Sequence, residues 1–123
     1  MVKEAKFQDI LIFNLFSGER LKMVDARPKS EYEKERIIRS VSLPLEEVHK
    51  DAAWFLQKDD MIVVYSGGND CRESELVATR LAEMGYQNVF NYKGGLADYK
   101  LQDLPLEGSL YPYNKGLAHA CSC

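Results

Sequence analysis

The sequence predicts a single α/β domain in which helices cover both faces of a small, mostly parallel sheet. Strand-like apolar runs alternate with helix-like segments at short spacing, and this alternation is typical of parallel strands joined by right-handed crossovers. The chain has 123 residues, which is enough to bury one core without disulfide staples. Hydrophobic residues make up 46% of the chain and charged residues 28%, a balance that excludes an intrinsically disordered protein.

Four apolar runs predict the strands of this sheet. The strongest is the continuous β-branched run that ends in Tyr65, which is typical of a strand covered on both faces. Another run ends in the carboxylate of Asp25. In parallel sheets the ligand site lies beyond the carboxyl ends of the strands, which is where we expect Asp25 and Ser66. The predicted strands are residues 21–25, 41–43, 61–65 and 89–92.

Apolar residues at helical spacing predict the helices between these strands. Ser30 and Glu33 have the spacing of a capping box, which would start a short helix. Trp54 and Phe55 end another predicted helix, and we interpret them as core residues together with Leu56. The helix that ends at these residues is expected over 45–55, and three further helices are expected over residues 7–15, 77–84 and 96–99.

The charge and cysteine counts exclude several classes of protein. Sixteen basic and nineteen acidic residues give a net charge of −3, which argues against bulk attraction to nucleic acid or to an anionic membrane. The first residues mix both charges, and no apolar run approaches the roughly 20 residues that a spanning helix needs. Cys71, Cys121 and Cys123 are an odd number and do not resemble a secreted disulfide framework. We therefore expect a cytoplasmic protein with no nucleic-acid or membrane partner.

A glycine-rich loop follows the strongest predicted strand and precedes a helix, over residues 66–74. The glycines let backbone N–H groups converge on one point, and the helix start adds positive partial charge. Asp70 and Glu73 resemble a capping box that would start this helix near Cys71. The loop is a candidate cradle for an anion or a thiolate, and the alternative is a plain strand-to-helix turn.

Several short motifs occur together in the order and spacing of a known family. The segment 23–32 contains an apolar strand, Asp, any residue, Arg, and then a Glu-aromatic pair, which resembles the opening signature of the rhodanese-like family. A Val-Ser-Leu-Pro run, the central strand, a Gly-Tyr pair, a strand with a double glycine and a closing turn are similar to later parts of that family. They lie at residues 41–44, 62–65, 85–86, 88–95 and 104–106, so that the resemblance covers residues 6–108.

The resemblance implies a rhodanese-like single domain with a small five-stranded parallel sheet and helices on both faces. It implies that residues 1–108 form this domain and that residues 109–123 form a tail with two cysteines. Active members of the family move sulfane sulfur through a cysteine persulfide. That cysteine is the first loop residue after the central strand, and Ser66 occupies this position here. A serine hydroxyl can donate a hydrogen bond to an anion, but it cannot carry sulfane sulfur.

Cys71 is the one thiol within the predicted loop. The loop is longer than the common form of the family, and it resembles a subset in which a second cysteine follows the first, at the position of Cys71. Arg72 and the nearby helix start would both stabilise a thiolate. Cys71 is therefore a displaced nucleophile, a resolving cysteine without its partner, or an apolar filler of the first helical turn.

The loop chemistry and the resemblance together give a set of candidate site residues. Asp25 and Arg27 form either a brace beside the site or a surface ion pair. Arg72 either binds an oxyanion such as thiosulfate or is solvated. We expect no metal ion and no other cofactor, because the His-x-Cys-x-Cys tail at residues 119–123 lacks a fourth ligand. The candidate catalytic residues are Cys71 and Ser66, and the candidate substrate-binding residues are Gly67, Gly68, Asn69, Arg72, Asp25 and Arg27.

Two functions fit these residues. The first is a sulfurtransferase in which Cys71 takes sulfur from a small sulfur-containing anion or a persulfide donor and passes it to an acceptor such as a protein thiol. The second is a catalytically inactive rhodanese-fold module that binds an anion or a protein. Phosphatase or arsenate reductase chemistry needs a cysteine at the start of the loop, and Ser66 stands there instead.

Overall fold

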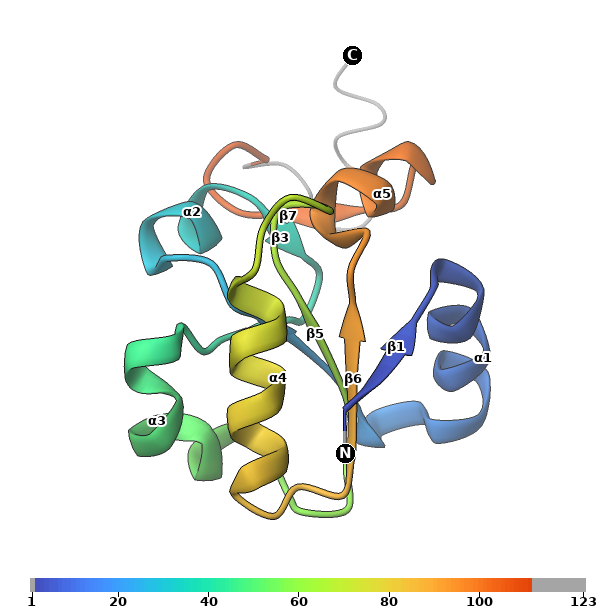
Figure 1. The fold of residues 1–123 in the computed structure, drawn as a ribbon. Coiled ribbons are helices and arrows are strands. Elements are labelled where there is room, and N and C mark those ends of the chain that lie inside the picture. Colours follow the sequence, from blue (N-terminus) through green and yellow to red (C-terminus); the bar gives the residue numbers. More distant parts are fainter. Residues whose placement is uncertain (1, 112–123) are drawn as a thin grey trace.

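A five-stranded parallel sheet runs through the centre of the protein, with the strand order β1-β6-β5-β2-β4 (Figure 1). The computed structural model describes residues 2–111 of the chain. This sheet confirms the predicted α/β fold. Its strands are β1 (Lys3–Ala5), β2 (Leu21–Asp25), β4 (Val41–Ser42), β5 (Met61–Tyr65) and β6 (Asn88–Tyr92).

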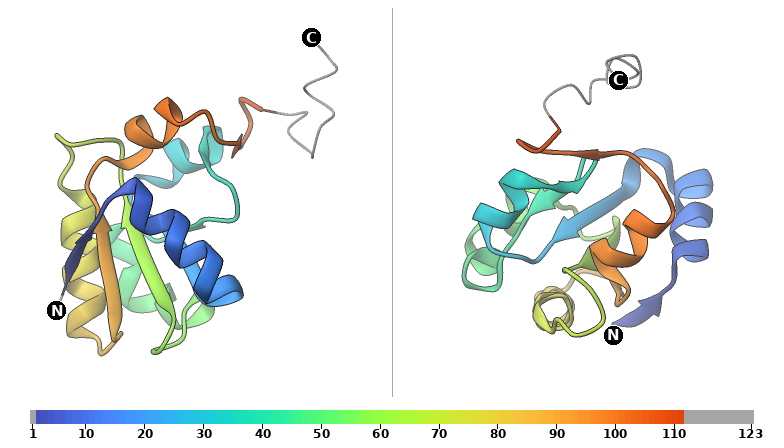
Figure 2. Two further views of the ribbon diagram at one scale, coloured as in Figure 1. Left: turned by 90° about the vertical axis from the view of Figure 1, so that its right-hand side faces the viewer. Right: turned by 90° about the horizontal axis from the view of Figure 1, so that it is seen from above.

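Helices cover both faces of the sheet, as the sequence predicts (Figure 2). α3 (Val48–Phe55) and α4 (Glu73–Glu83) pack on one face, and α1 (Phe7–Ser17) and α5 (Gly95–Leu101) pack on the other. Successive residues of a strand point to opposite faces. In β5, Ile62 and Val64 therefore join the α3–α4 core, whereas Val63 and Tyr65 join the α1–α5 core. The central strand is thus covered on both sides, which explains its continuous apolar run.

Three short strands were not predicted. β1 forms an edge of the sheet, and Ala5 is its one buried residue beside two exposed charged residues. Short charged edge strands protect a sheet from pairing with other chains, but they carry little apolar signal. β3 (Arg36–Ile37) and β7 (Leu106–Glu107) form a separate antiparallel pair, in which Ile37 lies opposite Leu106.

The start of α2 (Lys29–Lys34) differs from the prediction. Pro28 is the N-cap residue, and no side chain caps the helix. The predicted capping box of Ser30 and Glu33 is therefore wrong, because Ser30 already lies inside the first helical turn. The Pro28 carbonyl accepts hydrogen bonds from the backbone N–H groups of Glu31 and Tyr32.

The end of α3 corrects a second prediction. A short 3₁₀ turn over Leu45–Glu47 precedes the helix, so the helix presents Val48 and Ala52 to the core. Trp54 is 82% exposed and Phe55 is 45% exposed, whereas Leu56 is buried as expected. The predicted core position of Trp54 and Phe55 is wrong because this helical face points away from the sheet.

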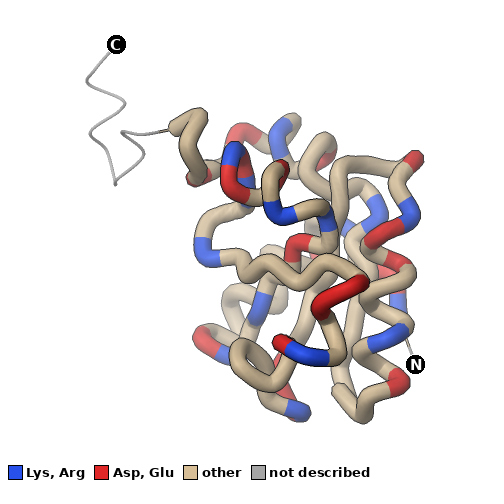
Figure 3. The backbone as a smooth tube through the Cα atoms, turned by 90° about the vertical axis from the view of Figure 1, so that its left-hand side faces the viewer, with Lys and Arg blue, Asp and Glu red and all other residues tan. Residues whose placement is uncertain are grey.

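No helix within residues 2–111 is long and apolar enough to cross a membrane. Acidic and basic residues are interspersed along the backbone in Figure 3. The chain also continues in contact with the domain beyond its last strand, because the backbone N–H of Ser109 donates to the carbonyl of Glu33 at 2.8 Å. The predicted division at residue 108 stays a prediction, and the tail cysteines lie outside the described residues.

Candidate functional site

The loop over residues 66–72 joins β5 to α4 at the carboxyl end of the parallel sheet. This is the edge at which α/β sheets bind their ligands. The helix begins at Glu73, and its N-cap residue, Arg72, makes no side-chain capping hydrogen bond. The predicted capping box of Asp70 and Glu73 is therefore wrong. Glu73 has a different partner in the structure, which is the first residue of the loop.

Ser66, at the position where the resemblance implies a catalytic cysteine, is 1% exposed. Its hydroxyl donates a hydrogen bond of 3.1 Å to the Glu73 carboxylate. Its carbonyl accepts a hydrogen bond of 2.8 Å from the backbone N–H of Leu96 at the start of α5. Gly95 lies so close that a Cβ there would stand 2.6 Å from the Ser66 carbonyl oxygen, and its φ is +62°. The glycine pair at residues 94–95 thus lets α5 hold the start of the loop.

Cys71 is a half-buried free thiol in the same loop. Its backbone N–H donates a hydrogen bond of 3.0 Å to the carbonyl of Gly68. This turn folds the side chain back over the beginning of the loop, because a Cβ on Gly67 would lie 3.2 Å from the Cys71 Sγ. The thiol is five positions from Ser66 in the sequence, yet it contacts the residue next to Ser66.

The charges around the loop are mainly acidic. The Arg72 side chain is 77% exposed, and its nearest carboxylate is that of Glu75 at 3.8 Å. Residues 70–75 contain three carboxylates and one guanidinium. The backbone amides and the helix start favour an anion, but these carboxylates oppose a second negative charge. The role of Arg72 in binding an oxyanion stays a prediction.

Asp25 and Arg27 form a buried ion pair beside the loop. The Asp25 carboxylate is fully buried, and it accepts hydrogen bonds from Arg27 Nη2 at 2.9 Å and from the Arg27 backbone N–H at 2.9 Å. Burial alone would lower the pKa of Arg27, but the hydrogen bond and the charge of Asp25 outweigh burial and raise it. Arg27 also donates to the carbonyl of Glu35. This is the geometry of a structural brace, and substrate binding by the pair stays a prediction.

Tyr65 is a site-supporting residue that sequence reasoning missed. Its hydroxyl donates to Ser40 Oγ at 3.0 Å and accepts from the backbone N–H of Ile37 at 3.1 Å. Burial and the neighbouring Asp25 raise the pKa of Tyr65 well above its usual value. The hydroxyl therefore stays protonated and ties the 36–40 segment to the end of β5. An aromatic residue directly before the loop is the one sequence feature that points to Tyr65, and no nearby residue indicates a partner for its hydroxyl.

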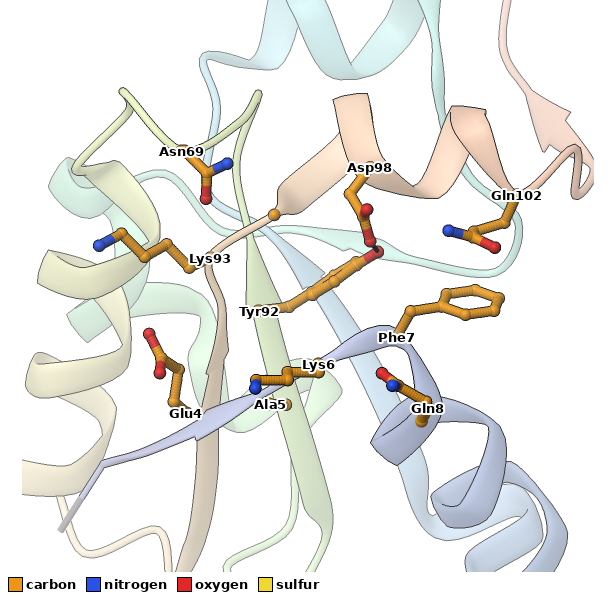
Figure 4. A pocket seen from close by; sticks show the side chains of 11 residues that line it. Glu4, Ala5, Lys6, Phe7, Gln8, Asn69, Tyr92, Lys93, Asp98 and Gln102 are labelled. Carbon is orange, nitrogen blue, oxygen red and sulfur yellow. Dashed lines mark hydrogen bonds between the residues drawn. The ribbon is translucent and has the colours of Figure 1, made fainter.

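A cavity of about 550 Å³ lies next to the loop, at the carboxyl ends of β1 and β6 (Figure 4). Asn69 reaches it from the loop, and Lys6 and Lys93 line it from the two strand ends. Within it, the Tyr92 hydroxyl donates a hydrogen bond to the Asp98 carboxylate, and burial together with this bond raises the pKa of Tyr92. Of the predicted site residues, Asn69 lines this cavity, whereas Ser66 and Cys71 are not among its lining residues.

The family model of the rhodanese-like domain matches residues 12–102. The chain belongs to the rhodanese-like domain family. This confirms the resemblance given by the sequence motifs.

Two curated relatives of this rhodanese-like domain are each 34% identical to it. One is YrkF of Bacillus subtilis (strain 168), whose name describes it as a sulfur carrier protein, and the match covers 68% of this chain and 43% of YrkF. The other is PspE of Escherichia coli (strain K12), named a thiosulfate sulfurtransferase, and the match covers 80% of this chain and 92% of PspE. The rhodanese-like domain thus spans less than half of YrkF and nearly all of PspE.

Solved structures share the fold of this rhodanese-like domain. The BH2092 protein of Bacillus halodurans superimposes with a TM-score of 0.78 at 25% identity, over 88% of this chain and 78% of the other. The rhodanese-like domain of the Alr3790 protein from Anabaena sp. gives a TM-score of 0.73 at 28% identity, over 89% and 82% of the two chains.

Among residues 2–111, no group of three or more His, Cys, Asp or Glu side chains is arranged to hold a metal ion. The tail residues His119, Cys121 and Cys123 lie outside the described residues.

Proposed function

We propose that this rhodanese-like domain transfers sulfane sulfur through the thiol of Cys71. The observation that carries the proposal is the position of Cys71 Sγ beside Gly67, the neighbour of Ser66. A sulfur atom held there lies close to the place where the family keeps its nucleophile, although a different residue supplies it. The names of YrkF and PspE, a sulfur carrier and a thiosulfate sulfurtransferase, support sulfur chemistry in this branch of the family.

The proposed reaction has two displacement steps. The Cys71 thiolate attacks the outer sulfur of thiosulfate, the bond between the two sulfur atoms of thiosulfate breaks, and sulfite leaves as a Cys71 persulfide forms. An acceptor thiolate then attacks the outer sulfur of that persulfide, which releases the Cys71 thiolate and forms a persulfide on the acceptor. With a small persulfide as donor, a thiolate leaves in place of sulfite. Neither step needs an external oxidant or reductant.

The charges beside the loop favour a donor with less negative charge than thiosulfate. Glu73 lies against Ser66, so a dianion at this point meets a carboxylate. A small persulfide monoanion is repelled less. Lys6 and Lys93 in the neighbouring cavity can hold an anionic group elsewhere on the donor or the acceptor. The acceptor thiolate can belong to a protein. We place the reaction in the reducing cytoplasm, where free thiols persist.

The test is the release of thiocyanate from thiosulfate and cyanide by the full chain and by a Cys71→Ser variant. We expect the variant to lose the activity, while a chain with Cys121→Ser and Cys123→Ser keeps it. Intact-mass measurement after exposure to thiosulfate should show one added sulfur atom that is absent in Cys71→Ser. Equal rates for the parent and Cys71→Ser contradict the proposal.

A second function is supported by the hydrogen bond between Ser66 and Glu73. This bond fills the position of the nucleophile with a hydroxyl and a carboxylate, neither of which carries sulfur. In that case the domain is an anion- or protein-binding module without sulfur transfer. A Ser66→Cys variant would then gain a sulfur atom from thiosulfate where the parent gains none. A sulfur atom on the parent protein excludes this second function.

A further inference from the structure

A second cavity of about 550 Å³ lies along the edge of β2. The two residues of β4 pair with Val24 and Asp25, so residues 21–23 have no described strand on this side, whereas β5 pairs with the whole of β2 on the other side. Residues of α1, of α5 and of the 37–39 segment form the remaining walls. The residues that line this cavity do not include the loop over residues 66–72, so the cavity is separate from Cys71.

The wall of this cavity is largely apolar and belongs to the core of the domain. Ile10 is 6% exposed, Met23 is 8% exposed and Ile37 is 2% exposed, yet their side chains border the cavity and do not fill it. Ligand pockets in proteins have volumes of roughly 300–1,000 Å³ and combine an apolar wall with a few placed polar groups. The apolar lining residues are Ile10, Leu21, Met23, Ile37, Ile38 and Tyr99.

Tyr99 brings a buried polar group to this apolar wall. The residue is 7% exposed, and its ring is held edge-on by Phe7, with the centroids 6.1 Å apart. Its hydroxyl has no hydrogen-bond partner among residues 2–111. Burial raises the pKa of Tyr99 although the charge of Arg39 lowers it, so the hydroxyl stays protonated. A buried hydroxyl without a partner costs free energy, and this position therefore favours an acceptor that enters the cavity.

Arg39 brings a positive charge to the same cavity. Its φ is +63°, and its backbone N–H donates a hydrogen bond of 3.1 Å to the Glu107 carboxylate, which fixes this turn. Within the described part of the chain its guanidinium forms no ion pair. Its charge acts on the hydroxyl of Tyr99, so the two donors lie near each other. A carboxylate is the acceptor that can bind a guanidinium and a hydroxyl together.

The other charged residues of the cavity favour a ligand with a single negative charge. Lys22 is already paired with the buried Asp60, at 3.2 Å. Glu19 is an exposed carboxylate that lines the cavity, and it repels a second carboxylate on a ligand. We propose that this cavity binds a small monocarboxylate with an apolar body, whose carboxylate accepts hydrogen bonds from Tyr99 and Arg39. The proposal is independent of sulfur transfer by Cys71.

Octanoate is the probe that tests this site, because it joins one carboxylate to an apolar chain. The isoleucine methyl groups of the full chain report where it binds, since Ile10, Ile37 and Ile38 line the cavity and Ile12 and Ile62 do not. In an NMR titration of the isoleucine-labelled protein, we expect the first three residues to shift together. The expected Kd is about 1 mM, which is ordinary for a ligand of this size. Ile12 and Ile62 should stay in place.

Two variants test the contacts of the carboxylate. Arg39→Met should weaken octanoate binding at least about tenfold, and Tyr99→Phe about threefold to tenfold, because each removes a hydrogen bond to the ligand. Arg80→Met, on α4, is the matched control and should leave the Kd unchanged. The isoleucine spectrum itself shows whether each variant is folded.

Two further probes test the charge of the ligand. Octylamine replaces the carboxylate by an ammonium group, and octanedioate adds a second carboxylate. Each should bind at least about tenfold more weakly than octanoate.

Three results would overturn the proposal. One is the absence of shifts in Ile10, Ile37 and Ile38 at about 10 mM octanoate, tenfold above the expected Kd. Another is octylamine binding as tightly as octanoate. The third is an unchanged Kd in both Arg39→Met and Tyr99→Phe, which would place the carboxylate elsewhere. Cys71→Ser should bind octanoate as the parent does, so a failure here leaves sulfur transfer by Cys71 untouched.

Discussion

The Ser66 hydroxyl donates a 3.1 Å hydrogen bond to the Glu73 carboxylate across the loop between β5 and α4. The bond joins the last buried position after the central strand to the first residue of the following helix. It holds the Glu73 carboxylate at the N-terminus of α4, beside the position where the resembled family has its nucleophile. The local charge of this site is thus set by the chain itself, before any ligand arrives.

Replacing that charge should change the choice of donor. In Glu73→Gln the hydrogen bond to Ser66 can persist, but the repulsion of a dianion is removed. We expect sulfur loading of Cys71 from thiosulfate to be about threefold to tenfold faster, which corresponds to about 1 kcal/mol. The measurement is the rate of sulfur addition by intact mass. Glu83→Gln, at the far end of the same helix, is the control and should leave the rate unchanged. Equal rates in both variants and the parent would show that Glu73 does not repel the donor.

The contact between Gly67 and Cys71 gives a second prediction. A Cβ on residue 67 lies 3.2 Å from the Cys71 Sγ, so Gly67→Ala should displace the thiol. We expect sulfur loading to slow by about tenfold, because misplacing a reacting group by 1 Å can cost about a hundredfold. Gly68→Ala is the matched control, since its Cβ meets Ala97 Cβ at an ordinary 3.4 Å. A parent-like rate in Gly67→Ala would place the reacting sulfur elsewhere.

The central part of the fold follows from the apolar pattern of the sequence. Strands β2 and β5 have the bounds that the sequence predicts. β5 is a β-branched run covered on both faces, and such a run has few other places in a small domain. The edge strand β1 was missed because Lys3 and Glu4 are exposed and charged. β7 was missed because its burial rests on Leu106, whose partner Ile37 is far away in the sequence.

The candidate site was predictable as a loop but not as an arrangement of atoms. The glycines and the cysteine place it correctly between β5 and α4. The bond between Ser66 and Glu73 was not predictable, because the spacing of Asp70 and Glu73 equally fits a helix cap. The position of Cys71 beside Gly67 depends on the turn in which the Cys71 backbone N–H donates to the Gly68 carbonyl. This is a backbone hydrogen bond, so the residue types do not predict it.

Gly95 should be needed for the position of the loop. Its φ of +62° costs a residue with a side chain about 1–2 kcal/mol, and a Cβ would stand 2.6 Å from the Ser66 carbonyl oxygen. We expect Gly95→Ala to lower the free energy of unfolding by this strain energy and by about 1–3 kcal/mol more because of the overlap. Gly18 also has a positive φ, +54° with a ψ of −124°, and nothing lies within 4 Å of its Cβ position, so Gly18→Ala adds backbone strain without overlap. Urea denaturation measures the free energy of unfolding of both variants. A loss of no more than about 1–2 kcal/mol in Gly95→Ala would mean that the loop and α5 separate easily.

The ion pair of Asp25 and Arg27 should contribute strongly to stability when one partner is removed. Arg27→Met leaves a fully buried carboxylate without its partner, and we expect a loss of about 3–5 kcal/mol in the free energy of unfolding. The exposed pair of Arg20 and Asp59 is the control, and Arg20→Met should cost no more than about 1 kcal/mol. A small loss in Arg27→Met, similar to the control, would show that water reaches Asp25 in the folded state.

Glu35 should make stability depend on pH in the acidic range. Burial alone would raise the pKa of Glu35, but hydrogen bonds from Tyr111 and Lys100 outweigh burial and hold it below its usual value of 4.5. A carboxyl with a lowered pKa stabilises the folded state above its unfolded pKa, and this contribution is lost as the pH falls through the folded value. We expect the difference in unfolding free energy between the parent and Glu35→Gln to be constant above pH 4.5 and to shrink below it.

The partner of Glu35 separates this effect from general acid unfolding. Tyr111→Phe removes one hydrogen bond to the carboxylate, so it should bring the pKa of Glu35 closer to its usual value and reduce the pH dependence.

The same variant should also change the stability at alkaline pH. The hydrogen bond to Glu35, aided by burial, raises the pKa of Tyr111 to about 12. The stability it supplies is fully present below the usual tyrosine pKa of 10.0 and is lost as the pH rises toward 12. Urea denaturation at a series of pH values measures the free energy of unfolding in both the acidic and the alkaline range. Identical pH profiles for the parent and Tyr111→Phe would show that this hydrogen bond does not form in solution.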